Sequence, residues 1–228
     1  METTYASSRT RDRVFAEGLS FYKKWWIFIA GSVIGTWYEE VITFVTKGVW
    51  ENRSAVIVGP FNPLYGVGFL LAVVLLHRIK SWWVSILIGA VVFGGFEYAA
   101  SWAQQFFTGS VSWDYRNLWF NIHGRTTVHY ALFWGLFATF MVKIVFQPLS
   151  SVIEKIPYHT GRFITQTLII FLAANMLITY TMLIRQGLRA QGHEPLTPIG
   201  VLYDQHFTDE WIQDHFPNMN LIVGEEGE

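Results

Sequence analysis

The residues best suited to chemistry in this sequence are concentrated between positions 97 and 125. A single glutamate, Glu97, lies inside an apolar run there, and a polar segment follows it. That segment adds carboxylate, amide, imidazole, guanidinium and aromatic groups, at Trp113, Asp114, Tyr115, Asn121, His123 and Arg125. Such groups can exchange protons or bind a charged solute. An ionisable side chain at membrane depth costs about 2.5–3.5 kcal/mol on insertion scales, so by default it marks a polar site.

A second group of polar residues lies upstream, at Glu39, Glu40, Asn52 and Arg53. Successive helix positions diverge by about 100°, so one of the two glutamates faces the interior, and Glu39 is the one expected there. A lone loop histidine such as His123 is more often a hydrogen-bonding surface residue than an acid–base group. No catalytic role is assigned, and the candidate site residues are Glu39, Asn52, Arg53, Glu97, Tyr98, Trp113, Asp114, Tyr115, Asn121, His123 and Arg125.

Composition indicates a membrane protein. The 228 residues are 52% hydrophobic and only 14% charged, whereas soluble domains carry about 25% charged residues. The net charge of −1 provides no basic field that would recruit nucleic acid. The chain has no cysteine, which excludes thiolate chemistry and disulfides, and its histidines show no close ligand spacing, so neither a metal nor a cofactor is expected.

Apolar runs near the roughly 20 residues needed to cross a bilayer predict an all-α, polytopic membrane helix bundle with about five transmembrane helices. The expected spans are residues 25–46, 64–79, 82–107, 128–146 and 163–184. Residues 1–24 are expected to be a cytoplasmic N-terminal segment, 25–184 the bundle, and 185–228 an acidic extramembrane tail with one short helix beginning at Thr208.

Several features predict how the spans pack and end. Glu97, Ser101 and Gln104 or Gln105 recur at helical spacing and should share one face of the third span. Three glycines allow a neighbouring helix to approach that span, at Gly89, Gly94 and Gly95. Asn175 and Thr179, four residues apart, stack on one face of the last span, and Asn175 is expected to join helices.

The connecting segments are predicted from the prolines that interrupt helices. Residues 47–63 contain two prolines and are expected to form a loop, which can dip into the membrane if protein covers it. Pro148 is expected to end the fourth span. Residues 150–162 are then expected to form a short loop on the cytoplasmic side.

The distribution of lysine and arginine favours a cytoplasmic N-terminus in a multi-pass protein of the cell membrane. Ten cations fall on the expected inner side and six on the outer, namely Arg9, Arg11, Arg13, Lys23, Lys24, Arg78, Lys80, Lys143, Lys155 and Arg162 against Lys47, Arg53, Arg116, Arg125, Arg185 and Arg189. In this orientation nearly all the candidate site residues lie at the outer end of the bundle.

Gathered at one end, these groups can pair with one another. Arg53 or Arg125 is expected to pair with Glu39, Glu97 or Asp114, which lowers the desolvation cost of each partner. A structural network that locks the loops onto the bundle and a site for a substrate or ion both fit this arrangement. The sequence leaves the choice open.

A series of short motifs between about residues 37 and 135 resembles, in order and spacing, the type IV, CmpB-like family of ABC-transporter permeases. The motifs are Trp37-Tyr38-Glu39, Asn52-Arg53, Gly59-Pro60-Phe61-Asn62-Pro63-Leu64-Tyr65-Gly66, Glu97-Tyr98, Trp113-Asp114-Tyr115 and Asn121-Ile122-His123-Gly124-Arg125. The resemblance implies a small polytopic membrane protein of permease type. Thr126 departs from it, since an apolar residue usually follows the Gly-Arg pair.

Three functions remain open. The first is a permease or permease-like transport component in the lipid bilayer, which would need a separate ATPase subunit, because the chain has no phosphate-binding loop, or would assemble as a homo-oligomer. The second is a membrane-embedded enzyme acting on a lipid or lipid-linked substrate, with Glu39 or Glu97 as base, Asp114 or His123 as acid, and arginines that bind an anion. The third is a structural or assembly protein.

Overall fold

The computed structural model describes residues 14–222, and helices make up most of it, which confirms the all-α bundle. Residues 1–13, including the three arginines counted above, and residues 223–228 lie outside the described part. The elements are α1 (Phe21–Lys47), α2 (Pro63–Leu76), α3 (Trp82–Thr108), β1 (Ser110–Val111), β2 (Asn121–Ile122), β3 (Thr126–Thr127), α4 (Val128–Phe140), the π-helical turn η1 (Met141–Val145), α5 (Phe146–Glu154), α6 (Tyr158–Ala190), α7 (Pro198–His206), α8 (Asp209–His215) and β4 (Asn220–Leu221).

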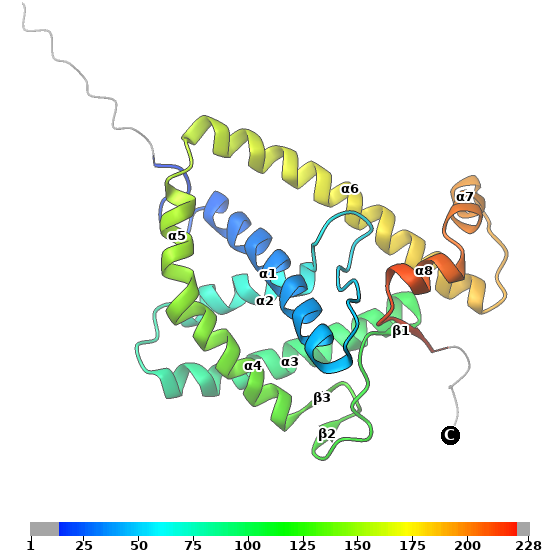
Figure 1. The fold of residues 1–228 in the computed structure, drawn as a ribbon, viewed down its shortest axis with the longest axis horizontal. Helices are drawn as coiled ribbons and strands as arrows, with labels where there is room; N and C mark the ends of the chain where they lie inside the picture. The colour runs from blue at the N-terminus through cyan, green and yellow to red at the C-terminus, as the bar shows by residue number, and fades with distance from the viewer. Residues whose placement is uncertain (1–13, 223–228) are drawn as a thin grey trace, which may run out of the picture.

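Within residues 14–222, four helical stretches are long and apolar enough to cross a membrane: α1, α3, the continuous run of α4, η1 and α5, and α6. The remaining expected span is α2, which has 14 residues and is therefore about 21 Å long. It begins halfway along α1, where the Asn62 amide donates to the Ser32 carbonyl at 3.1 Å. Residues 48–62, which we call the re-entrant segment, return into the bundle between α1 and α6 (Figure 1). This segment and α2 thus share the crossing.

Side chains of α6 satisfy the backbone of this re-entrant segment. The Ile57 amide donates to Thr179 Oγ1 at 3.1 Å, and the Val58 amide donates to Asn175 Oδ1 at 3.2 Å. Asn175 Nδ2 returns a bond to the Val58 carbonyl at 2.8 Å. Lipid offers no hydrogen-bonding partners, so irregular backbone at this depth needs them from protein. Asn175 was expected to join helices, and the structure corrects this, because its partner, like that of Thr179, is the re-entrant segment.

Pro148 does not end the fourth span, contrary to the sequence expectation, because the helix continues through α5 to Glu154. A π-helical turn lies just before the proline, and there the Phe146 amide bonds the Met141 carbonyl five residues back. Such a wider turn offsets the hydrogen-bond register, which accommodates the missing proline N–H. The loop expected at residues 150–162 consequently shrinks to residues 155–157.

Helices α3 and α4 pack closely through glycines, two of which were expected to allow this. A methyl group added at Gly89 would lie 3.0 Å from Gly135 Cα, and one at Gly94 would lie 2.8 Å from Ala131 Cβ. Gly95 has no such neighbour within 4 Å. The close approach brings side chains of α4 within reach of the polar face of α3.

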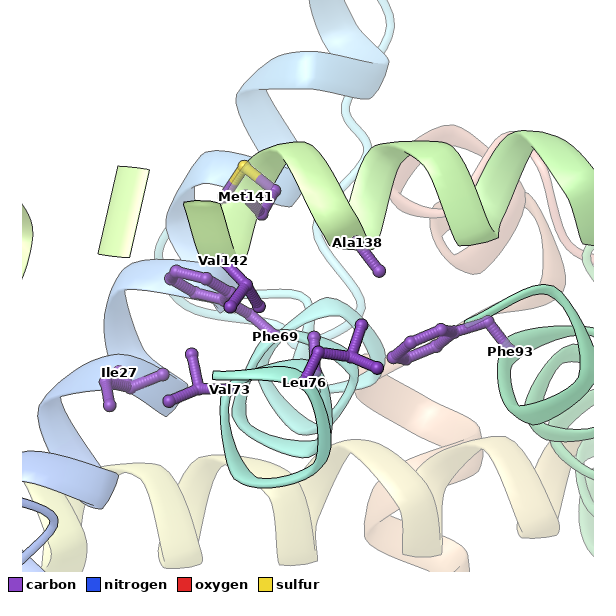
Figure 2. Packing of buried hydrophobic residues seen from close by; sticks show 9 residues of the cluster. Ile27, Phe69, Val73, Leu76, Phe93, Ala138, Met141 and Val142 are labelled. Atoms are coloured by element: carbon purple, nitrogen blue, oxygen red, sulfur yellow. The ribbon is translucent and has the colours of Figure 1, made fainter. Parts of the chain in front are cut away.

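The main hydrophobic core surrounds α2. Figure 2 shows Phe69, Val73 and Leu76 of α2 between Ile27 of α1, Phe93 of α3 and residues of α4 and η1. The short helix is therefore held on several sides by longer ones. This packing fixes its N-terminal end, which points toward the cavity described below.

The C-terminal tail folds back against the end of α6, where α7 and α8 lie beside it (Figure 1). Helix α6 continues to Ala190, past the expected end of the span at residue 184. Arg185 binds Asp204 of α7, with Nη2 at 2.6 Å from Oδ2, and β4 pairs antiparallel with β1. Helix α8 begins after its N-cap Thr208, as the sequence predicted.

Candidate functional site

A cavity of about 790 Å³ lies among α1, α2, α3 and α4. We call the end of the bundle that carries residues 48–62 and 109–127 the loop end. The cavity extends from there between the facing sides of the helices, and Glu39 of α1 and Glu97 of α3 both line it. Glu39, and not Glu40, is among its lining residues, as the helical geometry predicted. Most of the remaining wall is aromatic or aliphatic.

Glu97 is 7% exposed, and three neutral donors bind its carboxylate. Tyr115 Oη and Trp134 Nε1 donate to Oε1 at 3.1 and 3.0 Å, and Thr126 Oγ1 donates to Oε2 at 2.6 Å. These donors come from the loop after α3, from β3 and from α4. An ionised carboxylate accepts hydrogen bonds and donates none, so three donors suit that form. Thr126, where the resemblance led us to expect an apolar residue, therefore supplies one of the bonds to Glu97.

Glu39 accepts a hydrogen bond from the hydroxyl of Tyr65, in the first turn of α2. The Tyr65 ring lies 6.1 Å from the Trp134 ring, between centroids, so the donor to one carboxylate packs against a donor to the other. Tyr115 stacks on Tyr130 of α4 at 4.6 Å. We call these four residues, Tyr65, Tyr115, Tyr130 and Trp134, the aromatic cluster, and all four line the cavity.

Arg53 also lines the cavity, yet it is held at the rim. Its Nη2 lies 3.3 Å from Glu51 Oε2, and Nε and Nη2 donate to Thr43 Oγ1 at 3.0 and 2.9 Å. Its charge also acts on Glu39 at longer range. These contacts hold the guanidinium between the end of α1 and the start of the re-entrant segment.

Arg125 lies outside the cavity lining. It donates to Ser101 Oγ at 3.3 Å and to Gln105, and its guanidinium lies 5.9 Å from the Tyr98 ring centroid. The direct ion pairs expected of Arg53 and Arg125 with Glu39, Glu97 or Asp114 are therefore wrong within residues 14–222. The reason is that nearer polar side chains, which sequence alone cannot rank, satisfy both guanidinium groups.

Asp114, Asn121 and His123 hold the polar loop and do not line the cavity. Asp114 Oδ2 binds Arg116 Nε at 2.7 Å, and Asn121 Nδ2 donates to the Leu118 carbonyl at 2.8 Å. His123 Nδ1 lies 2.9 Å from Tyr98 Oη. Desolvation acts to raise the pKa of Asp114, but hydrogen bonds from the backbone and side chain of Arg116 outweigh it and lower that pKa.

Two further candidates connect the cavity to its surroundings. Trp113 lines the cavity and donates through Nε1 to the Arg125 carbonyl at 2.8 Å. Asn52 reaches the tail instead, since its Nδ2 donates to the His215 carbonyl at 2.9 Å. The candidates thus divide into cavity residues, which are Glu39, Arg53, Glu97, Trp113 and Tyr115, and residues that hold loops or the tail, which are Asn52, Tyr98, Asp114, Asn121, His123 and Arg125.

Sequence reasoning missed Tyr65, Tyr130 and Trp134 as site residues. In a chain with 10 tyrosines and 11 tryptophans, their residue types resemble those of interfacial belts. A usable signal was the helical spacing of Tyr130 and Trp134, four residues apart at the start of a span, which places both on one face. Tyr65, directly after Pro63 and Leu64, is fixed by the start of α2.

The geometry suits binding of a solute of moderate size. Cavities of about 300–1,000 Å³ with apolar walls and a few polar groups are typical ligand sites. Burial, and next the charge of Glu97, raise the pKa of Tyr115, so its hydroxyl remains a donor at neutral pH. The site can therefore present fixed carboxylates, hydroxyl donors and aromatic faces to the same bound molecule.

A family model described as "Putative ABC-transporter type IV" matches residues 26–180 of the chain. Neither the search of curated proteins nor the search of solved structures returned a match. The matched region contains both carboxylates, the re-entrant segment and all of the aromatic cluster.

Proposed function

Since the chain belongs to the ABC-transporter type IV family and its apolar helices make it an integral membrane protein, we propose that it is a permease-like transport component whose solute binds in the central cavity. The observation that carries this proposal is the cavity beside a discontinuous crossing. In many transporters the substrate site lies near the membrane midplane, where a helix is interrupted. Here α2 begins at mid-bundle, and Leu64 and Tyr65 of its first turn line the cavity.

The loop end is proposed to face outward and the N-terminus to face the cytoplasm of a cell-membrane protein. Residues 1–24 then form a cytoplasmic segment, and residues 185–228 form an external tail. Energy from ATP would come from a separate ATPase subunit, because the sequence has no phosphate-binding loop. The turn at residues 155–157 between α5 and α6 is the proposed docking point, and a second copy of the chain would complete the pathway.

The geometry favours transport over a lipid-modifying enzyme. That alternative assigned Asp114 or His123 as the acid and Arg125 as an anion binder, and none of the three lines the cavity. Each is engaged in holding the polar loop instead. Of the anion-binding groups, only Arg53 remains beside the carboxylates, and Glu51 already pairs with it.

The chain has no native cysteine, which allows a direct test of whether the cavity is reached by water. Ala100 of α3 lines the cavity, whereas its neighbour Ala99 is exposed on the outside of the bundle, where lipid would lie. Single substitutions Ala100→Cys and Ala99→Cys would be treated with a charged, membrane-impermeant thiol reagent in vesicles of both orientations. The reagent needs a thiolate in water.

We expect Ala100→Cys to be labelled and Ala99→Cys to remain unlabelled. Lack of reaction at Ala100→Cys from both sides would overturn the proposed solute path, as would equal labelling of the two variants. Native mass spectrometry of the complex extracted from its own membrane tests the partner. An ATPase in the complex supports ATP-coupled transport, and a complex without one removes that part of the proposal.

A further inference from the structure

We infer that the cavity binds an organic cation, an ammonium or phosphonium group with an apolar body. This rests on the proposal that the cavity is a solute site. Three charged side chains line the cavity, the two carboxylates of Glu39 and Glu97 and the single guanidinium of Arg53. Arg53 also pairs with Glu51 at 3.3 Å, a carboxylate that it shares with Lys47. The lining therefore carries excess negative charge.

Glu97 is the carboxylate that lacks a counter-charge. Its three bonded partners, Tyr115, Thr126 and Trp134, are neutral, and within residues 14–222 no cation forms an ion pair with it. Trp134 contributes an indole N–H, which can only donate, so the Oε1 it binds must act as an acceptor. A buried carboxylate without a cation carries a large desolvation cost. The attraction of a positive ligand entering from the cavity offsets that cost.

The aromatic cluster supplies the second half of a cation site. Faces of Tyr and Trp attract cations within about 6 Å, and the attraction is strongest where water is excluded. Tyr65, Tyr115, Tyr130 and Trp134 lie around the two carboxylates, joined by ring contacts of 6.1 Å and 4.6 Å. Aromatic cages recognise quaternary ammonium groups, and here two carboxylates, Glu39 and Glu97, line the same cavity as the rings.

The start of α2 also faces the cavity, and a helix N-terminus would favour an anion. Here two of the N–H groups of that end are already bonded. Asn62 accepts from the Leu64 amide through its side chain at 3.1 Å and from the Gly66 amide through its carbonyl at 3.3 Å, and Pro63 has no N–H to offer. Asn62 therefore occupies two of the donors that would otherwise bind an anion at this helix end.

The shape of the cavity selects an organic cation over a metal ion. Ca²⁺ and Mg²⁺ take six or more oxygen ligands at short range, and Zn²⁺ takes about four ligands from His, Cys, Asp or Glu. Within residues 14–222, no group of three or more acidic, histidine or cysteine side chains could hold such an ion. The volume of about 790 Å³ and the apolar walls instead fit a bulky hydrophobic body, with its charge at Glu97.

The test uses two ions of matched shape and opposite charge, tetraphenylphosphonium and tetraphenylborate. Their saturable binding to the full chain in lipid nanodiscs would be measured by equilibrium dialysis. We expect wild type to bind the phosphonium ion and not the borate. Glu97→Gln should weaken phosphonium binding about tenfold or more. The control is Glu40→Gln, the same change at a glutamate of α1 that does not line the cavity, and it should leave binding unchanged.

A second pair of variants isolates the aromatic contribution. Tyr130→Phe keeps the ring and should retain phosphonium binding. Tyr130→Leu removes the ring and should weaken phosphonium binding about tenfold, as Glu97→Gln does. Equal phosphonium affinity in wild type and Glu97→Gln overturns the inference, and so does saturable borate binding by wild type. If Ala100→Cys is labelled while neither ion binds, the transport proposal stands and the cation inference fails. If Ala100→Cys is unreactive, the proposal that the cavity is a solute site fails as well.

Discussion

Replacing Asn175 by alanine should destabilise the bundle through the re-entrant segment. The change removes the bond that Asn175 Oδ1 accepts from the Val58 amide, at 3.2 Å, and the one that Nδ2 donates to the Val58 carbonyl, at 2.8 Å. Both belong to one residue of the irregular segment between α1 and α2. No helix or strand partner replaces them, because residues 55–60 are in neither element.

The size of the effect follows from two limits. Side-chain hydrogen bonds in membrane bundles average about 0.6 kcal/mol each, which gives a lower limit of about 1.2 kcal/mol for two. A backbone group left unpaired in a buried site costs about 1–3 kcal/mol. Two such groups at the lower figure give about 2 kcal/mol, and we expect a loss of that size in the free energy of unfolding.

The loss would be measured by denaturant unfolding in detergent micelles, with Asn117→Ala on the exposed polar loop as the control. Hydrogen exchange provides a local readout, because the amides of Ile57 and Val58 should exchange faster in Asn175→Ala. A loss below about 0.5 kcal/mol, with unchanged exchange at these two amides, would refute the claim that α6 holds the segment in place.

Two further predictions concern charged groups away from the cavity. Lys23 is fully buried, with Glu154 at 2.6 Å and Ser150, whereas the Glu154 side chain is 38% exposed. Glu154→Gln should therefore cost more, about 3 kcal/mol, than Lys23→Met, because it leaves an unpaired buried ammonium; the reverse order in denaturant unfolding would contradict this. Hydrogen bonds from Arg185 chiefly lower the pKa of Asp204, against desolvation, so the carboxylate stabilises the fold above its unfolded pKa of about 3.9. Wild type should then exceed Asp204→Asn in thermal stability at pH 7, with a difference that shrinks as pH falls through the lowered pKa; a pH-independent difference would contradict the ion pair.

Much of the helical framework could be predicted from the sequence, because hydrophobic length and periodicity report directly on spans and faces. The polar face of α3 was predictable for this reason, and so was the interior position of Glu39. The prediction that Pro148 ends the fourth span was wrong because a proline disrupts only the local hydrogen-bond register, and a π-helical turn can offset that disruption. Sequence carries little signal for such a turn.

The partners of the charged residues could not be predicted. Which side chain satisfies Arg125 depends on rotamers and on the exact crossing of α3 with the polar loop, so Gln105 and Ser101 could not be distinguished in advance from carboxylates. The bonds to Glu97 were hidden for a related reason. Trp134 and Thr126 are separated from it by up to 37 residues, and only the close packing of α3 and α4 brings them together.

The attachment of the re-entrant segment to α6 has a consequence for how the chain is made. Asn175 is synthesised 117 residues after Val58, which at about 5–20 residues per second is a delay of roughly 6–23 s. During that time the segment has no protein partner for its amides at membrane depth, and lipid supplies none. The re-entrant segment must therefore wait in a water-filled or chaperoned setting, such as the insertion machinery, until α6, the last of the long apolar helices in residues 14–222, completes its crossing.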